Sequence, residues 1–482
     1  MSSLSQHLPR LLPLAASLGL AFGLTTPTQT VSAATLLVTD CTDGAGSGTL
    51  RHTIASAAAN DTVLIQAGTC SKITVSGSQI VPLVTPLTIQ GPGSAQLTIS
   101  GGLDASPSQY HRVFASVGSL TLTGMTINEA KYTATPFPIG GCVYTGGSLS
   151  LNDVVLQDCF VEPSTGVSAN TRGGAAYSKG GMVMLNSNVS YNLITASSTT
   201  RGLGAGVYAK AGLIAKYSTI SHNSNLASSG SGGGAYVSGG VATFFKDTIS
   251  HNSAPRGAGF FTAGPSGGGG GGGNLTVSYT TISNNTGTDN GAFEARAVDG
   301  TKTAKIVNST ISGNVVTGFQ GGAGTYMPTQ VYNSTIAFNR AGTSSFAVGL
   351  YSNQTIKMQS SIFANNTGNG SYDVGSRLGV LNGANNVITA TTSAVPLGTI
   401  STCPKLGPLK NNGAGLFTHA LQFNSPAIDQ GNLTGGSLTT DERGATRNVG
   451  GGVDIGSYER QASETQLTDD RIFYAEFESA CF

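Results

Sequence analysis

The stretch YSTISHN at residues 217–223 returns at residues 246–252 as KDTISHN, so two segments 29 residues apart share five of seven residues. Related stretches are NSNVSYN (186–192), YTTISNN (279–285), NSTISGN (308–314), NSTIAFN (333–339) and QSSIFAN (359–365). Successive copies are 25 to 33 residues apart. A period in that range indicates a solenoid, in which each repeat forms one coil.

An aliphatic residue stands at the centre of every copy. This column comprises Val189, Ile220, Ile249, Ile282, Ile311, Ile336 and Ile362, and degenerate copies around Ile127 and Val155 extend it upstream. A second apolar column lies five residues earlier and comprises Met184, Ala215, Phe244, Val277, Ile306 and Val331. Stacked coils place like residues on one another, so both columns are predicted to form a continuous core.

A glycine motif precedes most copies. Its versions are GGCVY (140–144), GGAAY (173–177), GAGVY (204–208), GGAY (233–236), GAGFF (257–261), GGAGTY (321–326) and AVGLY (347–351). The tyrosine usually lies 10 to 13 residues before the aliphatic column, which suits a strand, a turn and a second strand. With 69 glycines and 10% charged residues, long amphipathic helices are disfavoured. We predict an all-β fold, a single-stranded, right-handed parallel β-helix.

An asparagine follows the aliphatic column by three residues in each copy. The predicted column is Asn192, Asn223, Asn252, Asn285, Asn314, Asn339 and Asn365. Stacked amides can hydrogen-bond along the coil axis, and asparagine tolerates the left-handed backbone of a sharp turn. We therefore expect an asparagine ladder at one corner of the solenoid.

Both ends of a solenoid need caps, because an open end coil exposes strand edges. Leu50, Ile54 and Ala57 have helical spacing, which predicts a short capping helix within residues 48–60. The predicted organisation is a signal peptide (1–34), an N-terminal cap with the first coils (35–100), β-helix repeats (101–400), a C-terminal cap (401–460) and a tail (461–482).

The first residues have the pattern of an export signal. The apolar run 11–24 is shorter than a membrane span, and small residues at a cleavage spacing follow it. A signal peptide is favoured over an uncleaved anchor, so we expect a secreted or cell-surface protein. The formal net charge of +1 disfavours nucleic acid or an anionic membrane as partner. We expect no membrane span in the mature chain, no cofactor and a monomer.

Six cysteines follow this leader, an even number that indicates disulfides in an oxidising compartment. Spacing alone allows 15 pairings. We favour Cys41 with Cys70 and Cys142 with Cys159, which are close in sequence, and Cys403 with Cys481, which remain.

The residues DGAGSGTLRHTIASAAANDTVLI, SPAIDQGN (425–432) and TTDERGATRNVGGGVDIGSYE (439–459), with the GGAY and ISxN repeats, resemble the bacterial secreted parallel β-helix proteins of the choice-of-anchor Q group. The repeats are also similar to those of polymorphic outer-membrane proteins. This resemblance covers nearly all of the chain after the leader. It implies a surface-exposed or released β-helix of a bacterium, and it brings no established catalytic residue.

Three groups of side chains could carry chemistry. Arg172, Arg201 and Arg256 precede glycine motifs and could form a basic stripe that contacts acidic glycans, although solvated corner arginines are the favoured interpretation. His222 and His251 occupy the same slot in consecutive coils, which allows metal binding or, as we favour, simple stacking.

The third group is a set of C-terminal charges: Asp429, Asp441, Glu442, Arg443, Arg447, Asp454 and Glu459. We read them first as an ion-paired cap and second as a cation site.

Enzymes of this architecture need carboxylates and a basic residue in neighbouring coils. Lys246 and Asp247 lie near one strand, and Glu294, Arg296 and Asp299 share a charged excursion, but no carboxylate pair occupies neighbouring coils. We read these groups as solvated charges.

The leading hypothesis is a non-catalytic, adhesin-like or glycan-contacting scaffold whose partner is a polysaccharide or a host or matrix surface. The alternative is a polysaccharide lyase or glycoside hydrolase on an acidic polysaccharide, similar to pectate lyase or polygalacturonase. A third hypothesis is a structural spacer.

Overall fold

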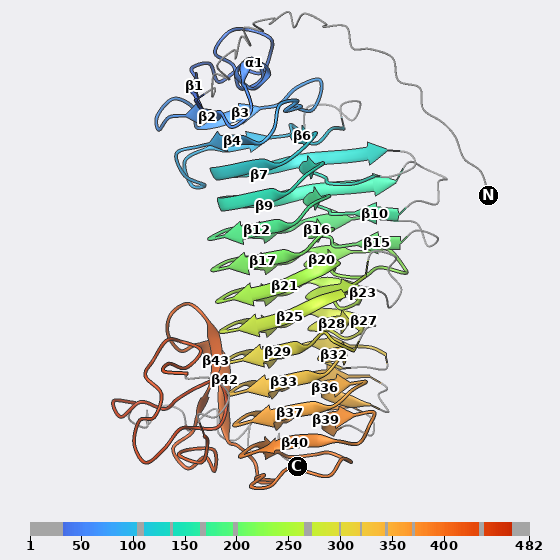
Figure 1. The fold of residues 1–482 in the computed structure, drawn as a ribbon, viewed down its shortest axis with the longest axis vertical. Coiled ribbons are helices and arrows are strands. Elements are labelled where there is room, and N and C mark those ends of the chain that lie inside the picture. The colour runs from blue at the N-terminus through green and yellow to red at the C-terminus, as the bar shows by residue number, and fades with distance from the viewer. Residues whose placement is uncertain are drawn as a thin grey trace, which may run out of the picture.

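The computed structural model describes residues 32–464 apart from 104–109, 135–137, 164–169, 196–200, 265–271, 298–299, 319–320, 343–345, 369–371 and 433–437. Within this part the chain winds into an elongated solenoid, with a short helix near the N-terminal end (Figure 1). Strands of successive coils pair in parallel along the long axis. The prediction of an all-β parallel β-solenoid is therefore confirmed.

Each coil contributes strands to several sides of the solenoid. The glycine motifs form a 10-stranded sheet of β6 (Phe114–Ser116), β8 (Val143–Thr145), β11 (Ala176–Ser178), β16 (Val207–Ala209), β20 (Ala235–Ser238), β24 (Phe260–Ala263), β28 (Phe293–Arg296), β32 (Ala323–Tyr326), β36 (Ala347–Ser352) and β39 (Tyr372–Ser376). The second side comprises β1 (Thr35–Val38), β2 (Thr62–Ile65), β4 (Leu87–Gln90), the first parts of β7 (Leu120–Ala134) and β9 (Leu149–Pro163), β12 (Met182–Leu185), β17 (Leu213–Lys216), β21 (Gly240–Phe245), β25 (Gly272–Ser278), β29 (Ala304–Val307), β33 (Thr329–Tyr332), β37 (Ile356–Gln359) and β40 (Leu381–Ala384).

The third side carries the repeated Thr-Ile-Ser strands. It comprises β3 (Lys72–Thr74), β5 (Thr98–Ser100), the middle of β7 and β9, β13 (Asn188–Ser190), β18 (Thr219–Ser221), β22 (Thr248–Ser250), β26 (Thr281–Ser283), β30 (Thr310–Ser312), β34 (Thr335–Ala337), β38 (Ile362–Ala364) and β41 (Val387–Ile388). Shorter strands continue beyond this side: β14 (Leu193–Ile194), β19 (Ser224–Asn225), β23 (Ser253–Arg256), β27 (Thr286–Asp289), β31 (Val315–Val316) and β35 (Arg340–Ala341), and separately the pair β10 (Asn170–Arg172) and β15 (Arg201–Leu203).

The aliphatic column lies in the core as predicted. Ile220 pairs with Val189 on one side and with Ile249 on the other, and all three side chains are buried. Two members of the predicted column are wrong by one residue. Leu156 takes the place assigned to Val155, and Phe363 takes the place assigned to Ile362. Each of these positions has two adjacent apolar residues, so the sequence did not decide which one faces inward.

The asparagine ladder is confirmed with one correction: six hydrogen bonds join the asparagines of seven successive coils. Nδ2 of each ladder asparagine donates to Oδ1 of the next, from Asn192 through Asn223, Asn252, Asn285, Asn314 and Asn339 to Asn366, at 2.8 to 3.0 Å. The predicted member Asn365 is wrong and Asn366 replaces it, because the register shift that brings Phe363 inward also moves the ladder by one residue.

The left-handed backbone does not belong to the ladder asparagines themselves. It falls on the residue immediately before each one, for example Tyr191 (φ 58°), His222 (φ 56°), His251 (φ 55°) and Asn365 (φ 58°). The prediction for this corner was therefore right about the turn and wrong about the residue that adopts it. The ladder amides are buried, and the residues before them point outward.

The N-terminal coils agree with the prediction for the helix and for two disulfides. Helix α1 spans Leu50–Ser56, begins at the N-cap Thr49 and buries Leu50 and Ile54. Disulfides join Cys41 to Cys70 and Cys142 to Cys159. The third predicted pair includes Cys481, which lies outside the described residues, as do the signal peptide up to residue 31 and most of the tail. No helix in the described ranges is long and apolar enough to cross a membrane.

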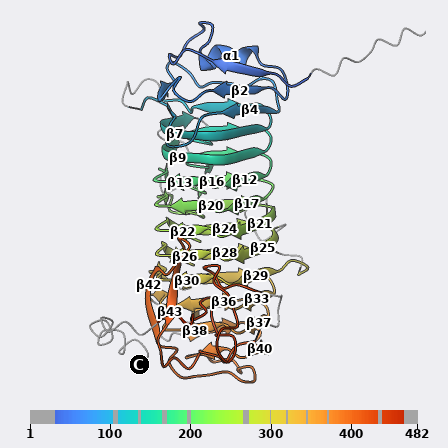
Figure 2. The same cartoon turned by 90° about the vertical axis from the view of Figure 1, so that its left-hand side faces the viewer.

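The described residues 401–432 and 438–464, called the C-terminal segment below, lie along the side of the solenoid. They contain the antiparallel pair β42 (Leu406–Asn411) and β43 (Phe417–Leu421). In Figure 2 this hairpin lies in front of the lower coils, while β13 and β22 above it are in view. The segment predicted as a C-terminal cap thus covers part of the Thr-Ile-Ser side.

Candidate functional site

The outward-facing residues of β13, β18, β22, β26, β30, β34 and β38 form a band that we call the threonine strip. In each strand the central residue faces the core, so its two neighbours face outward. Thr219 and Thr248 are half-buried, whereas Thr281 and Thr310 are completely buried. We call β13, β18 and β22 the open part of the strip, and β26, β30, β34 and β38 the covered part.

Residues with left-handed backbone flank the strip on both sides. The first flank is Asn186, Tyr217, Lys246, Tyr279, Asn308, Asn333, Ser360 and Asn385, with φ between 44° and 54°. The second flank is Tyr191, His222, His251, Asn284, Gly313, Phe338 and Asn365, with φ between 55° and 66°. The flanks of the open part carry mostly rings and a lysine, and those of the covered part carry mostly small residues.

The C-terminal segment holds the covered part through hydroxyl groups. Oγ1 of Thr310 donates to Oε2 of Glu442 (2.5 Å), and Oγ1 of Thr281 lies 3.1 Å from Oε1 of the same carboxyl. His419 Nε2 lies 2.8 Å from the Ser312 hydroxyl. Burial raises the pKa of Glu442 to about 8 and lowers the pKa of His419 to about 4. Both groups are therefore neutral at pH 7 and suit an interface that excludes water.

Further along, the covered part becomes apolar. Ile362, displaced from the core column by Phe363, faces the C-terminal segment and clusters with Ala337, Ile455 and Tyr458. A Cβ at Gly456 would lie 2.8 Å from Cδ1 of Ile362, so this close approach requires glycine. The segment thus sits on the strip through polar contacts at one end and an apolar cluster at the other.

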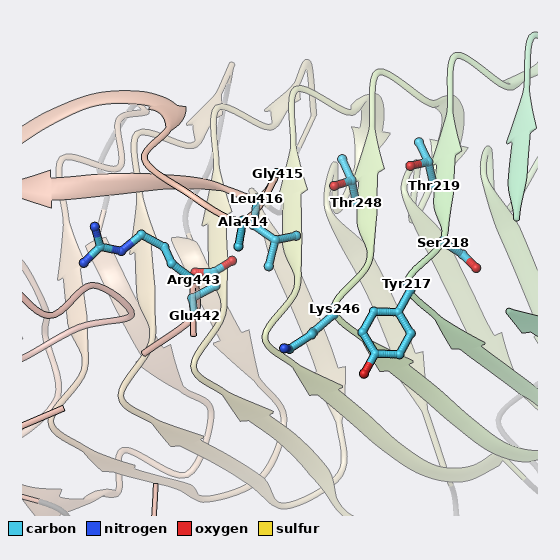
Figure 3. A pocket seen from close by; sticks show the side chains of 10 residues that line it. All are labelled: Tyr217, Ser218, Thr219, Lys246, Thr248, Ala414, Gly415, Leu416, Glu442 and Arg443. Carbon is cyan, nitrogen blue, oxygen red and sulfur yellow. The ribbon is translucent and has the colours of Figure 1, made fainter. Parts of the chain in front are cut away.

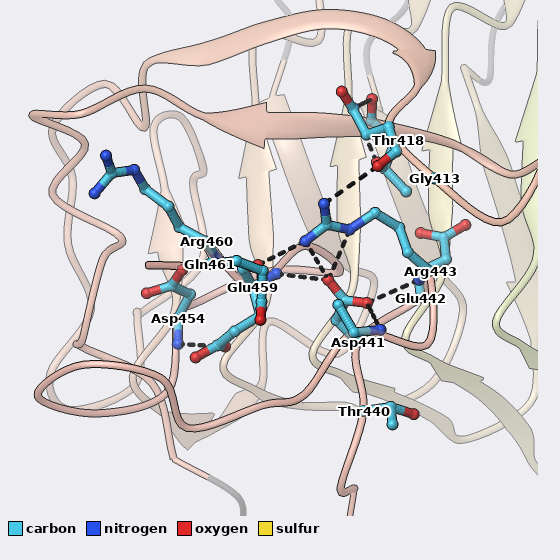
Figure 4. A network of polar contacts seen from close by, with 12 residues as sticks. Gly413, Thr418, Thr440, Asp441, Glu442, Arg443, Asp454, Glu459, Arg460 and Gln461 are labelled. Carbon is cyan, nitrogen blue, oxygen red and sulfur yellow. Dashed lines mark hydrogen bonds and ion pairs between the residues drawn. The ribbon is translucent and has the colours of Figure 1, made fainter. Parts of the chain in front are cut away.

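Four of the seven predicted C-terminal charges, Asp441, Arg443, Arg447 and Glu459, form ion pairs, as the favoured interpretation predicted; Asp429 and Asp454 accept from backbone N–H groups, and Glu442 contacts threonine hydroxyls. Arg443 pairs with Asp441 and Glu464, both at 2.8 Å, and lies 3.7 Å from the ring centroid of Tyr458. Figure 4 shows Arg443 at the centre of this network, with Glu459 and Asp454 beside it. Arg447 and Glu459 form a second pair at 3.4 Å with no exposed side-chain surface.

The remaining predicted charge, Asp429, accepts from the backbone N–H groups of Gly451 and Gly452. In the described ranges, no group of three or more His, Cys, Asp or Glu residues could hold a metal ion.

A pocket of about 330 Å³ lies where the open part of the strip meets the C-terminal segment (Figure 3). Its lining comprises Tyr217, Ser218, Thr219, Lys246, Thr248, Ala414, Gly415, Leu416, Glu442 and Arg443. The strip supplies hydroxyl groups and a lysine, and the C-terminal segment supplies a backbone turn at Ala414–Leu416. In Figure 3, Lys246 extends between Tyr217 and Glu442.

Lys246 supplies the uncompensated charge of this pocket. Its Nζ lies 5.9 Å from the ring centroids of Tyr217, Phe245 and Tyr279, and no acidic side chain pairs with it within the described part of the chain. Arg443 already pairs with two acidic side chains, so it is occupied. Lys246 is therefore the group of this pocket that can contact an anion.

The predicted arginine residues do not form one stripe. Arg172 and Arg256 share a register position but are separated by Leu203 and Ser231, and Arg201 pairs with Asn170 instead. The guanidinium carbon of Arg172 lies 5.4 Å from the ring centroid of Tyr208, and that of Arg256 lies 5.8 Å from the ring centroid of Phe261.

These rings belong to an outward stack on the glycine-motif sheet: Tyr144, Tyr177, Tyr208, Tyr236 and Phe261, with centroids 5.0 to 5.6 Å apart. Arg172 and Arg256 thus pack against an aromatic stack, and Arg201 acts electrostatically on Tyr236 within it.

Two carboxylates predicted to be solvated are buried. Asp247 accepts from the backbone N–H groups of Ser218 (2.7 Å) and Phe245 (2.9 Å) inside the corner, and burial raises its pKa to about 7. Glu294 pairs with Arg256 and Arg296 and is fully buried. The third member of that excursion, Asp299, lies outside the described residues. The solvated interpretation is wrong for Asp247 and Glu294 because each has partners in neighbouring coils.

The histidine prediction is confirmed as a stack. The ring centroids of His222 and His251 lie 4.8 Å apart with an interplanar angle of 3°, and Tyr191 continues the stack at 4.7 Å from His222. All three lie on the second flank of the open part.

Sequence reasoning missed the pocket, because Glu442 and Lys246 are far apart in the chain. A usable signal was present in the first position of each copy, which changes from Tyr or Lys at 217–279 to Asn at 308 and 333.

No protein-family model matches the sequence, and no curated protein matches it. Among solved structures, the crystal structure of pectate lyase Pel9A has a TM-score of 0.41 and 14% sequence identity, with 90% of this chain and 98% of that chain covered.

Proposed function

We propose that this protein is an exported, non-catalytic scaffold that binds a linear polysaccharide on the open part of the threonine strip. The observation that carries the proposal is the contrast within one strip: the same strands are sealed by the chain's own C-terminal segment in one part and left open beside a polar pocket in the other. The strip presents similar polar groups once per coil, so it can contact successive sugar units of a linear polysaccharide in the same way.

The open part offers the groups that sugars use. Thr219 and Thr248 supply hydroxyls about 4.8 Å apart along the axis. Tyr191 and Tyr217 are 56% and 51% exposed, and such rings combine an apolar body with a polar tip. Exposed rings at this density beside a pocket are typical of a binding surface.

Two observations support export. Disulfides such as Cys41–Cys70 persist in oxidising compartments, and the leader has the pattern of a signal peptide. We propose membership of the choice-of-anchor Q group and a place at the bacterial surface or outside the cell on the motifs quoted above.

The alternative of a glycoside hydrolase receives less support from the pocket. Hydrolysis through acid–base chemistry uses two carboxyl groups. Of the residues that line the pocket, Glu442 alone has a carboxyl group, and both its oxygens contact threonine hydroxyls in a fully buried position.

A glycan array with the purified mature protein tests the proposal, and binding to linear polysaccharides should weaken in Tyr217→Ala. The matched control is Tyr372→Ala, a tyrosine at the end of the glycine-motif sheet. Unchanged glycan binding in Tyr217→Ala would contradict the assigned surface. Shortening of polygalacturonate during incubation would instead favour the enzyme.

A further inference from the structure

We infer that the pocket receives the end of the polysaccharide chain and that the terminal sugar carries an anionic group. This inference rests on the proposed function. It follows from the juxtaposition of three features: the open strip, the uncompensated Lys246 and the wall that the C-terminal segment builds across the strip (Figure 3).

The wall closes the strip at β26. Oγ1 of Thr281 lies 2.9 Å from the carbonyl oxygen of Phe417 and accepts from the Phe417 N–H at 3.2 Å. Thr281 has no exposed surface, whereas Thr248, one coil earlier, is half-buried and lines the pocket. A chain that runs along the open strip therefore meets the C-terminal segment after Thr248 and has no continuing groove of hydroxyls.

The opposite end of the open strip is also bounded. Oγ1 of Thr126 donates to the carbonyl oxygen of Ser94 at 2.7 Å, and Thr126 is 9% exposed. Between these limits lie the outward positions of four coils: Val155 of β9, next to the strip, and then Asn188, Thr219 and Thr248 of its open part, or three steps. At about 4.8 Å per step they span about 14 Å, which is the length of roughly three to four sugar units. The strip thus accommodates a short stretch that terminates at the pocket.

The unpaired Lys246 of the pocket favours a terminal sugar that carries a negative charge. Lys246 has no acidic partner in the described part of the chain, whereas Arg443 already pairs with Asp441 and Glu464. A carboxylate or a sulfate on the terminal sugar would supply the missing negative charge and would accept from Nζ of Lys246. Hydroxyls of Thr219, Thr248 and Tyr217 surround the same space and can bond the sugar ring.

The direct test is a length series of oligogalacturonates, from the monomer to about ten sugars, measured by calorimetry. Affinity per chain should rise up to roughly four sugars and then stay constant. Sedimentation should find one protein per chain at every length. A number of bound proteins that grows with chain length would overturn the chain-end inference.

Sulfated and neutral oligosaccharides of the same length form the second arm. Anionic oligomers should bind about tenfold more tightly than neutral ones, and the sulfated and carboxylated series identify which anion fits. Equal affinity for neutral oligomers would overturn the anionic part of the inference. If no oligomer or polymer binds at any length, the proposed function itself fails.

Two variants localise the effect. Lys246→Gln should remove the preference for anionic oligomers, while Lys210→Gln, an exposed lysine at another corner, should keep it. Thr248→Trp should block the pocket and abolish binding, while Thr243→Trp, an outward threonine of the same coil on the second side, should not. Retained anion preference in Lys246→Gln would exclude this lysine as the anion contact.

Discussion

The open and covered parts of the threonine strip share their backbone, their core and nearly their strand sequence, yet one faces solvent and the other is sealed. Thr-Ile-Ser occurs at β18 and β22 in the open part and again at β26 and β30 in the covered part. The difference lies in the residues with left-handed backbone on either side. Where Tyr217 and Lys246 stand in the open part, Asn308 and Asn333 stand in the covered part.

This comparison indicates that the flanks determine what the strip binds. Asn308 is small enough for Arg447 and Thr440 to reach it, at 2.6 and 2.7 Å. A tyrosine or lysine at the same position would occupy the space of the C-terminal segment. Tyr217 and Lys246 would therefore obstruct docking of the segment on β18 and β22, the surface that we propose for a ligand.

The strongest way to break the comparison is to place an open-part residue in the covered part. In Asn308→Tyr, Arg447 loses one of its acceptors within a buried interface, and the larger ring overfills the site. We expect a loss of about 2–5 kcal/mol of docking free energy for the C-terminal segment. Hydrogen exchange of β42 and β43 measures it. The control Asn284→Tyr, on the exposed second flank, should leave these amides protected; equal protection in Asn308→Tyr would contradict the role of the flanks.

The ladder below the strip should not distinguish the two parts. Asn252→Ala and Asn339→Ala each remove a buried amide that bonds both neighbouring coils, and each should lower the free energy of unfolding by about 1–3 kcal/mol. Urea unfolding measures both. Asn382→Ala, at an exposed position of β40, is the control. A much smaller loss of unfolding free energy in Asn252→Ala than in Asn339→Ala would show that the ladder contributes less to stability in the open part.

Docking of the C-terminal segment on the covered part should weaken at both high and low pH. Burial raises the pKa of Glu442 from 4.5 to about 8, so its contribution to docking is complete below pH 4.5 and is lost as the pH rises through 8. Burial lowers the pKa of His419 from 6.5 to about 4, so its contribution is present above pH 6.5 and is lost as the pH falls through 4.

Docking should therefore be firmest between the ordinary pKa values of the two groups, at about pH 4.5 to 6.5, and weaker on both sides. The hydrogen-exchange protection of the β43 amides, measured as a function of pH, gives this profile. Glu442→Gln should flatten the alkaline side, and His419→Gln the acidic side. A profile that is unchanged in both variants would show that other groups control docking.

The reciprocal substitution should have the smallest effect on stability. Tyr217→Asn gives the open part a covered-part residue, and because Tyr217 is 51% exposed, the free energy of unfolding should change by less than about 0.5 kcal/mol. Ligand affinity should nevertheless fall about tenfold. Thermal unfolding measures the stability and calorimetry measures the affinity. A large loss of stability with intact binding would show that Tyr217 stabilises the fold and does not contact the ligand.

The sequence was sufficient for the coils because their information is repeated. Ile220 and Ile249 could be placed in one column, and Asn223 and Asn252 in one ladder, since each copy corroborates the next. It failed by one residue at Ile362, where two apolar residues adjoin. It could not place Glu442 against Thr281 and Thr310, because the C-terminal segment has no repeat and its contacts span more than a hundred residues.

The charges were hardest to place for a related reason. Asp247 reads as a surface residue in its own copy, where the neighbouring copies have serine or threonine at that position. The stacked coils show that Asp247 occupies the same buried position as Ser218 and Thr280 in the neighbouring coils. The side chain at this position accepts a hydrogen bond from the backbone N–H of the previous coil.

The central claim is that the open part of the strip, and not the aromatic stack on the glycine-motif sheet, is the ligand surface. Hydroxyl-radical footprinting of the protein with and without saturating oligogalacturonate tests it most directly. Tyr191 and Tyr217 should become protected, while Phe423, which is 63% exposed on the C-terminal segment, should react as before. Protection of Tyr144 and Phe346 on the glycine-motif side, with Tyr191 and Tyr217 unchanged, would contradict the account.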